Sequence, residues 1–211
     1  MASPMTAGAP SGEIADRIAR VAARLFAAEG YDATSVRTIV EAASVTKPTL
    51  YYYFASKEAL AQTLLTAAID RLAVGLRAIL AGPECATDKL VAIVEEHFRL
   101  CREDPDLARF AYAMFFGPRS SHLSAVLAEL GRSLVEIMAQ AIGRLVEERI
   151  VARERMEECI AAARGLITIY TMDNLYSGVA LDSHLARRLV GNLLQGFGLG
   201  QDSASAAPRR H

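Results

Sequence analysis

Glycines and prolines divide this 211-residue chain into long segments, most of which have a helix-forming composition. These breaks lie at Gly30, Gly82-Pro83, Asp104-Pro105, Gly117-Pro118 and Gly178. Between them, apolar residues recur at intervals of three and four, which is typical of one face of an amphipathic helix. No segment alternates apolar and polar residues over a sustained stretch, as a half-buried strand would. The pattern therefore predicts an all-α protein.

The predicted helices follow from the same periodicity. They are one helix from Glu13 to just before Gly30, two short ones at 35–43 and 47–53, a long one from Ser56 to just before Gly82, and five more at about 87–103, 106–115, 121–151, 154–177 and 183–198. Residues 165–172 are rich in β-branched side chains that would suit a strand, but no turn signal separates them from the helical pattern on either side. We therefore expect that segment to be helical, and we expect disordered tails at 1–10 and 201–211.

Composition excludes several classes of protein. With 22% charged residues and a net charge of -1, the chain is neither wholly disordered nor a histone-like polycation. The longest uncharged stretch in the chain body, from Leu189 to Gln201, is shorter than the roughly 18 apolar residues that cross a bilayer. Residues 1–12 lack the basic and apolar regions of a secretion signal. We expect a cytoplasmic protein without a membrane partner.

Residues 34–60, TSVRTIVEAASVTKPTLYYYFASKEAL, carry the most information about function. Two short helical pieces are separated by Ser44-Val45, which leaves room only for a tight turn. Thr34 can cap the first piece, Thr46 or Lys47 begins the second, and Pro48 fits only an opening helical turn. Helix, tight turn and short helix make up a helix-turn-helix, whose second helix can enter a major groove of DNA.

The side chains of the second piece support contact with DNA. Two of the three lysines in the chain, Lys47 and Lys57, bracket it, and no acidic residue lies between Ala42 and Lys57. Between the two lysines lie hydroxyl groups of the kind that contact phosphate oxygens. They belong to Thr46, Thr49, Tyr51, Tyr52 and Tyr53. The alternative from residue types alone is a helical hairpin with a tyrosine-rich solvent face.

This stretch resembles the N-terminal signature of the TetR (tetracycline-repressor-like) family of transcriptional regulators. The residues that carry the resemblance are Gly30-Tyr31, Thr34, Ile39, Ala42-Ala43-Ser44-Val45, Thr49-Leu50-Tyr51, Tyr53-Phe54 and Ser56-Lys57-Glu58. The resemblance implies a three-helix DNA-binding domain, expected here at 11–55, and a larger helical domain for ligand binding and dimerisation at 56–200. It extends from Glu13 to Leu60, and beyond Leu60 only the general plan is similar.

The resemblance also implies roles for individual residues. It places Thr34, Ser35, Tyr51, Tyr53 and Lys57 at phosphates, and Thr46, Lys47, Thr49 and Tyr52 nearest the bases or the adjacent backbone. The chain departs from the family pattern at Ser44 and Pro48, where glycine is common. Serine must there accept a turn conformation that suits glycine better, and proline offers no N–H for a DNA contact.

The second half of the chain suggests an effector pocket. Aromatic and sulfur side chains gather around Pro105, and a second group puts polar residues within an apolar helix. The candidate ligand-binding residues are Phe98, Cys101, Phe110, Met114, Phe115, Tyr170, Asp173 and Asn174. Asp173 and Asn174 would orient an apolar or aromatic effector, because unpartnered burial of either side chain would be costly. The alternative is ordinary core packing with one exposed polar edge.

The last two helices are expected, by resemblance, to pair with their copies in a homodimer. An apolar stripe supports this and consists of Leu181, Leu185, Leu189, Leu193 and Leu194. The alternative is that the stripe packs only within its own subunit.

Histidines do not occur at metal-ligand spacing, and neither a phosphate-binding glycine loop nor a glycine-flanked nucleophilic serine is present, so we expect no enzyme, metal or cofactor.

Together these observations predict a homodimeric transcriptional regulator. We expect a repressor that binds a palindromic double-stranded DNA operator and is released by a small apolar or aromatic effector. The alternative is a helical small-molecule-binding protein without DNA-binding activity.

Overall fold

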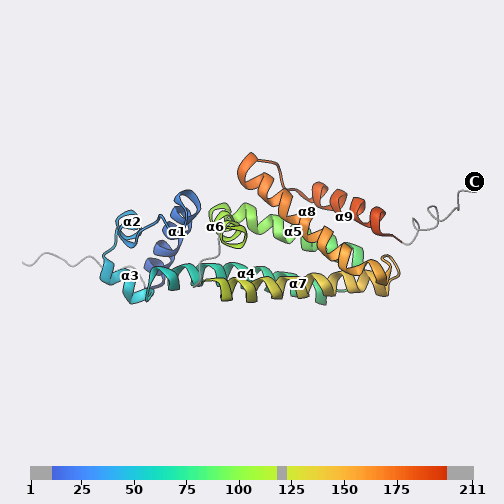
Figure 1. Ribbon diagram of the computed structural model, residues 1–211, viewed down its shortest axis with the longest axis horizontal. Coiled ribbons are helices and arrows are strands. Elements are labelled where there is room, and N and C mark those ends of the chain that lie inside the picture. The colour runs from blue at the N-terminus through green and yellow to red at the C-terminus, as the bar shows by residue number, and fades with distance from the viewer. Residues whose placement is uncertain (1–10, 118–122, 199–211) are drawn as a thin grey trace, which may run out of the picture. The chain divides into compact units, whose positions relative to one another are not determined.

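The computed structural model describes residues 11–117 and 123–198 of the chain (Figure 1). The tails predicted to be disordered, 1–10 and 201–211, lie outside the described residues. Within those ranges the chain forms nine α-helices and one 3-10 turn, η1. They are α1 (Ser11–Glu29), α2 (Val36–Ala42), α3 (Lys47–Tyr53), α4 (Lys57–Ala81), α5 (Ala86–Glu103), α6 (Pro105–Phe116), α7 (Ser124–Glu147), η1 (Arg153–Arg155), α8 (Met156–Ser177) and α9 (Ser183–Phe197). The all-α prediction is confirmed, including the helical conformation of residues 165–172.

Helix α7 ends four residues earlier than the predicted 151, for a local reason. Arg149 adopts a left-handed conformation with a φ of 57°. The N–H groups of Arg149 and Ile150 donate to the carbonyls of Val146 and Leu145. This pair of bonds closes the helix and turns the chain away from its axis. The sequence offers no glycine here to reveal the stop.

The described residues form two compact units. The first takes its residues from Met1–Ala68 and Asp106–Leu127, and the second from Ile69–Pro105 and Ala128–His211. Helix α6 therefore belongs, apart from Pro105, to the first unit together with α1–α3. The functional division into a DNA-binding domain at 11–55 and an effector domain at 56–200 stays a prediction.

The core of the first unit is built from one face of each short helix. Helix α1 contributes Ile18 and Phe26, α2 contributes Ile39, and α3 contributes Leu50, all of them at most 1% exposed. Phe110 of α6 is also fully buried, and its ring centroid lies 4.9 Å from that of Phe26. Burial of these large side chains is the main force that holds α2 and α3, because helices of seven residues are marginal alone.

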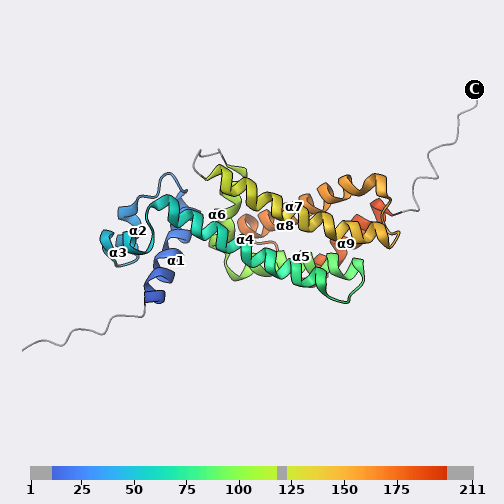
Figure 2. The same cartoon turned by 90° about the horizontal axis from the view of Figure 1, so that it is seen from below.

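The second unit has its core where α5, α8 and α9 contact one another (Figure 2). The stripe Leu181, Leu185, Leu189 and Leu193 is buried within this core, and Leu194 is half-buried. The leucine stripe therefore does not form an exposed dimer face. These leucines pack within their own subunit, as the alternative held.

In the described residues, no helix is long and apolar enough to cross a membrane.

Candidate nucleic-acid interface

The turn between α2 and α3 is closed by a compact set of backbone hydrogen bonds. Ser44 has a φ of 52°, in the left-handed region where glycine is usual. Its N–H donates to the carbonyl of Glu41, and the N–H of Val45 donates to that of Val40 at 3.0 Å. This is a Schellman ending. The expected cost of serine at this position is thus real, since the backbone takes the conformation that glycine would take freely.

The start of α3 is fixed by Thr46. The Thr46 Oγ1 atom accepts a hydrogen bond from the Thr49 N–H at 3.2 Å and lies 2.8 Å from the Thr49 hydroxyl. Pro48 lies in the first turn, as predicted, where no intrahelical partner for its missing N–H exists. Leu50 is the buried residue of the helix. Helix α3 is therefore held through the face that carries Leu50, and its opposite side is exposed.

The exposed side of α3 carries most of the predicted DNA-contacting residues. Tyr52 is 79% exposed and Tyr51 is 48% exposed. Thr46 and Lys47 are exposed, whereas Thr49 and Tyr53 are half-buried. The first turn contains no acidic residue. We call Thr46, Lys47, Thr49, Tyr51 and Tyr52 the α3 surface; it combines a cation, hydroxyls and aromatic rings, which suits phosphate and groove contacts.

Thr34 does not join this surface. Its side chain is fully buried, and its hydroxyl donates to the Gly30 carbonyl at 2.8 Å. It cannot reach a phosphate from there, so its predicted DNA contact is corrected to a role in shaping the loop before α2. Ser35 is the residue that caps α2, since its Oγ accepts from the Thr38 N–H at 3.0 Å. The sequence placed the cap one residue too early.

Lys57, at the start of α4, is half-buried and already engaged. Its ammonium donates to the backbone carbonyls of Tyr31 at 2.9 Å and Thr34 at 3.0 Å. It also lies 4.3 Å from the centroid of the Tyr31 ring. Burial of the phenol, followed by the neighbouring Glu58 and Asp32 carboxylates, raises the pKa of Tyr31 above its ordinary value. Tyr31 therefore stays neutral beside the ammonium.

The predicted effector residues fall in both units. In the second, Phe98 and Cys101 are buried in α5, and Tyr170, Asp173 and Asn174 of α8 are half-buried. In the first, Phe110 is core and Met114 and Phe115 are half-buried. Burial raises the pKa of the Cys101 thiol to about 11, which opposes reactivity.

Asn174 has a local structural partner. Its side-chain N–H donates to the Val179 carbonyl at 2.7 Å, across the left-handed Gly178 that ends α8. The amide therefore stabilises the connection to α9, and an orienting role toward a ligand would have to compete with that bond. Asp173, the half-buried residue before it, stays the predicted orienting group.

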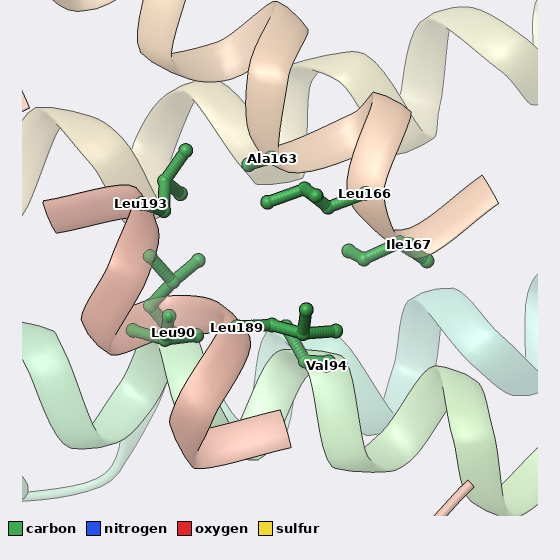
Figure 3. A pocket seen from close by; sticks show the side chains of 8 residues that line it. Leu90, Val94, Ala163, Leu166, Ile167, Leu189 and Leu193 are labelled. Carbon is green, nitrogen blue, oxygen red and sulfur yellow. The ribbon is translucent and has the colours of Figure 1, made fainter. Parts of the chain in front are cut away.

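Sequence reasoning missed a small apolar cavity in the second unit (Figure 3). Its lining comes from α5 (Leu90, Val94), α8 (Ala163, Leu166, Ile167) and α9 (Leu189, Val190, Leu193). The cavity volume is about 10 Å³, roughly the space that one water needs. Its residue types are those of any core, so nothing in the sequence could have distinguished it. Among the residues described, no group of three or more potential metal ligands comes together.

Comparison with known proteins finds relatives of this helix-turn-helix. The model of "Bacterial regulatory proteins, tetR family" matches residues 18–64, from the buried face of α1 into α4. The HTH-type transcriptional regulator YdgC of Bacillus subtilis (strain 168) is 28% identical over 185 residues, which are 86% of this chain and 91% of YdgC.

Solved structures agree over most of the chain. A TetR-family transcriptional regulator from Bordetella parapertussis 12822 is 26% identical, with 86% of this chain and 94% of that chain covered and a TM-score of 0.73. The fatty acid degradation regulator FadR from Bacillus halodurans shares the fold at 21% identity, with 90% and 98% coverage and a TM-score of 0.74. With its helix-turn-helix and exposed α3 surface, the chain is similar to the tetR family of bacterial regulatory proteins over residues 18–64, and the comparisons support a DNA-binding transcriptional regulator of that family.

Proposed function

We propose that this regulator is a homodimeric repressor that binds a palindromic operator and leaves it when a small apolar or aromatic effector binds. The observation that carries the proposal is the exposure of Tyr52 at 79% on a helix whose buried residue is Leu50. Tyr51 beside it is 48% exposed, and contiguous exposed aromatic side chains are typical of a contact surface for a partner. The neighbouring Lys47 adds the charge that DNA would neutralise.

On DNA, α3 lies in the major groove. Thr46, Lys47, Thr49 and Tyr52 face the bases or the adjacent backbone, and Ser35, Tyr51 and Tyr53 face phosphates. Ser35 is exposed, and its Oγ accepts the capping bond from the Thr38 N–H. Its phosphate contact is therefore made at the start of α2. Pro48 is exposed in the same turn of α3 and contributes contact area without a hydrogen bond.

The dimer forms through the outer side of α8, with α9 beside it. A strip of exposed residues runs along α8 at intervals of three and four and consists of Ala161, Gly165, Ile169 and Tyr176, with the half-buried Met172. Ile169 is 53% and Tyr176 62% exposed. Small residues at one end permit close helix approach, and the apolar ones reward it. A two-fold dimer implies half-sites about 34–36 Å apart or a multiple of that.

Effector binding acts by population shift in the second unit. The proposed effector contacts are Phe98, Cys101, Tyr170 and Asp173. Because most of these side chains are apolar or aromatic, they favour an effector without phosphate groups. The effector binds best to a conformation whose two recognition helices are wrongly spaced for DNA. A coupling of about 1–3 kcal/mol is enough to change operator occupancy several-fold.

The test is a mobility shift on the DNA that flanks the protein's own gene, with random duplex of equal length as reference. Wild type should prefer the flanking DNA, and Tyr52→Ala should lose that preference while remaining folded. If wild type binds both duplexes equally or not at all, the repressor assignment fails. If an apolar compound raises the melting temperature but the protein shows no preference for the flanking duplex, the result would instead support a small-molecule-binding protein.

A further inference from the structure

We propose that Lys57 is a positioning residue, which holds the loop before α2 against the start of α4 and does not itself contact a phosphate. The proposal rests on the proposed DNA contacts of α2 and α3, and it corrects the phosphate role that the sequence predicted for this lysine. What Lys57 does instead is set the place from which those helices meet DNA.

The contacts of the ammonium carry the first step. A lysine has three N–H donors, and here two are used on the carbonyls of Tyr31 and Thr34, at 2.9 and 3.0 Å. The same ammonium faces the Tyr31 ring at 4.3 Å, a geometry in which the ring quadrupole attracts the cation. Hydrogen bonds from a charged donor are stronger than neutral ones. A move to a phosphate would break this set of interactions.

The residues that the lysine holds carry the second step. Tyr31 and Thr34 lie in the connection that begins at Gly30, whose φ is 90°. The Thr34 hydroxyl closes the same loop onto the Gly30 carbonyl, and the Tyr31 ring meets Phe26 of α1 edge-on at 5.3 Å. Lys57 thereby ties α1, the loop and the first residue of α4 together.

The third step is the position of this loop relative to α2. Ser35, the cap of α2, follows Thr34 directly. Helix α2 then passes through the closed Ser44 turn into α3, so a displacement of the loop is transmitted to the α3 surface. Lys47 offers a clear contrast, because it is exposed on α3 itself and is proposed to contact DNA directly.

The experiment compares Lys57→Met with Lys47→Met in the full-length protein. Each change removes one charge and keeps a long apolar side chain. Affinity for the flanking duplex is measured at several salt concentrations, because the slope of log K against log salt falls by about 0.9 for each phosphate that the protein no longer neutralises. Ile18→Val, a buried change in α1, serves as the control for a modest loss of stability, and all proteins are assayed well below their melting temperatures.

A positioning role predicts that Lys57→Met loses at least tenfold in affinity with an unchanged salt slope. It also predicts faster amide exchange at Ser35 and Thr38, while Ile18→Val keeps wild-type affinity. Lys47→Met should lower the slope. A lower slope for Lys57→Met would make it a phosphate contact and overturn the proposal. Unchanged affinity in Lys57→Met would overturn it too, because only stability would then depend on the lysine. Wild type that binds no duplex would instead overturn the proposed function.

Discussion

The rings of Phe26 in α1 and Phe110 in α6 lie with their centroids 4.9 Å apart, and both side chains are almost completely buried. This contact makes α6 part of the core that supports α2 and α3. Phe110→Ala is therefore expected to destabilise the protein by about 3–5 kcal/mol, because apolar burial is removed and a cavity is left behind. Urea unfolding measured by circular dichroism gives the free energy of unfolding directly.

Phe116→Ala is the matched control, because Phe116 ends the same helix and is 66% exposed. Its effect should stay within about 0.5 kcal/mol. Equal destabilisation by the two substitutions would show that the Phe26–Phe110 contact does not stabilise the first unit. The sequence had placed Phe110 among the effector contacts, since residue type alone does not separate a pocket from a core.

Local signals predicted the helices well. Helix starts and ends are marked by Pro48, Gly30 and Gly178. The backbone preferences of proline and glycine can be read directly from the sequence. The long helix was expected from Ser56, and the Oγ of Ser56 accepts from the Ala59 N–H at its start. These features need only a few neighbouring residues.

Contacts between distant residues could not be predicted in this way. Lys57 bonds to carbonyls 23 and 26 residues earlier in the chain, and backbone carbonyls have no sequence signature. Thr34 was assigned to DNA because its residue type suits a phosphate, yet its hydroxyl faces Gly30. The leucine stripe of α9 had the right periodicity for a helix, but periodicity cannot say which surface covers it. The burial of Leu189 against its own subunit emerges only from the packing of α9 on α5 and α8.

Replacing Ser44 by glycine should stabilise the protein. The left-handed φ of 52° costs serine about 1–2 kcal/mol, while glycine adds about 0.5–1 kcal/mol of chain entropy to be overcome on folding. The net gain in Ser44→Gly is therefore about 0–1.5 kcal/mol. Gly178→Ala provides the reverse test, because Gly178 has a φ of 73° and an added Cβ would meet no atom within 4 Å. Thermal unfolding should move upward for the first variant and downward for the second; shifts of the same sign would refute this explanation.

The three cysteines should differ in reactivity. Cys85 is exposed, whereas burial raises the pKa of the Cys101 and Cys159 thiols to about 11. At pH 8 a thiol-specific disulfide reagent should modify Cys85 first, and the other two only after unfolding. Rapid modification of all three in the folded protein would contradict this expectation. Mass spectrometry of the modified peptides identifies each site.

The same two thiols give a pH dependence of stability. In the unfolded chain they ionise with a pKa near 9.0, and in the folded chain with a pKa of about 11, so above pH 9 the folded state retains protons that the unfolded state has released. Stability should therefore be complete below pH 9 and fall as pH rises toward 11. Urea unfolding at pH 8 and pH 10.5 measures the decrease, which should shrink when Cys101 and Cys159 are both replaced by alanine.

The α8 strip predicts how to separate the proposed dimer into monomers. Gly165→Arg places a long cation at the centre of the strip, where an added Cβ meets no atom within 4 Å of the same chain. The fold should tolerate it, whereas a two-fold contact would bring two such cations together. Sedimentation should report a monomer, with weaker operator binding. Val74→Arg, at a valine 66% exposed on α4, is the control and should remain dimeric. A dimer that survives Gly165→Arg would move the interface elsewhere.

Tyr52 allows the direct DNA contact to be separated from folding. Its ring meets Tyr53 edge-on at 4.9 Å but is 79% exposed, so Tyr52→Ala should change the free energy of unfolding by no more than about 0.5 kcal/mol. On operator DNA the same change should cost about 1–3 kcal/mol, the range of a good specific contact, and the cost on random duplex should be smaller. Tyr52→Phe divides this effect, because it keeps the ring and removes the hydroxyl. If Tyr52→Phe binds like wild type, the ring carries the contact; if it binds like Tyr52→Ala, the hydroxyl does. Equal costs on operator and random DNA would instead place Tyr52 at the phosphate backbone, where it adds affinity without reading sequence.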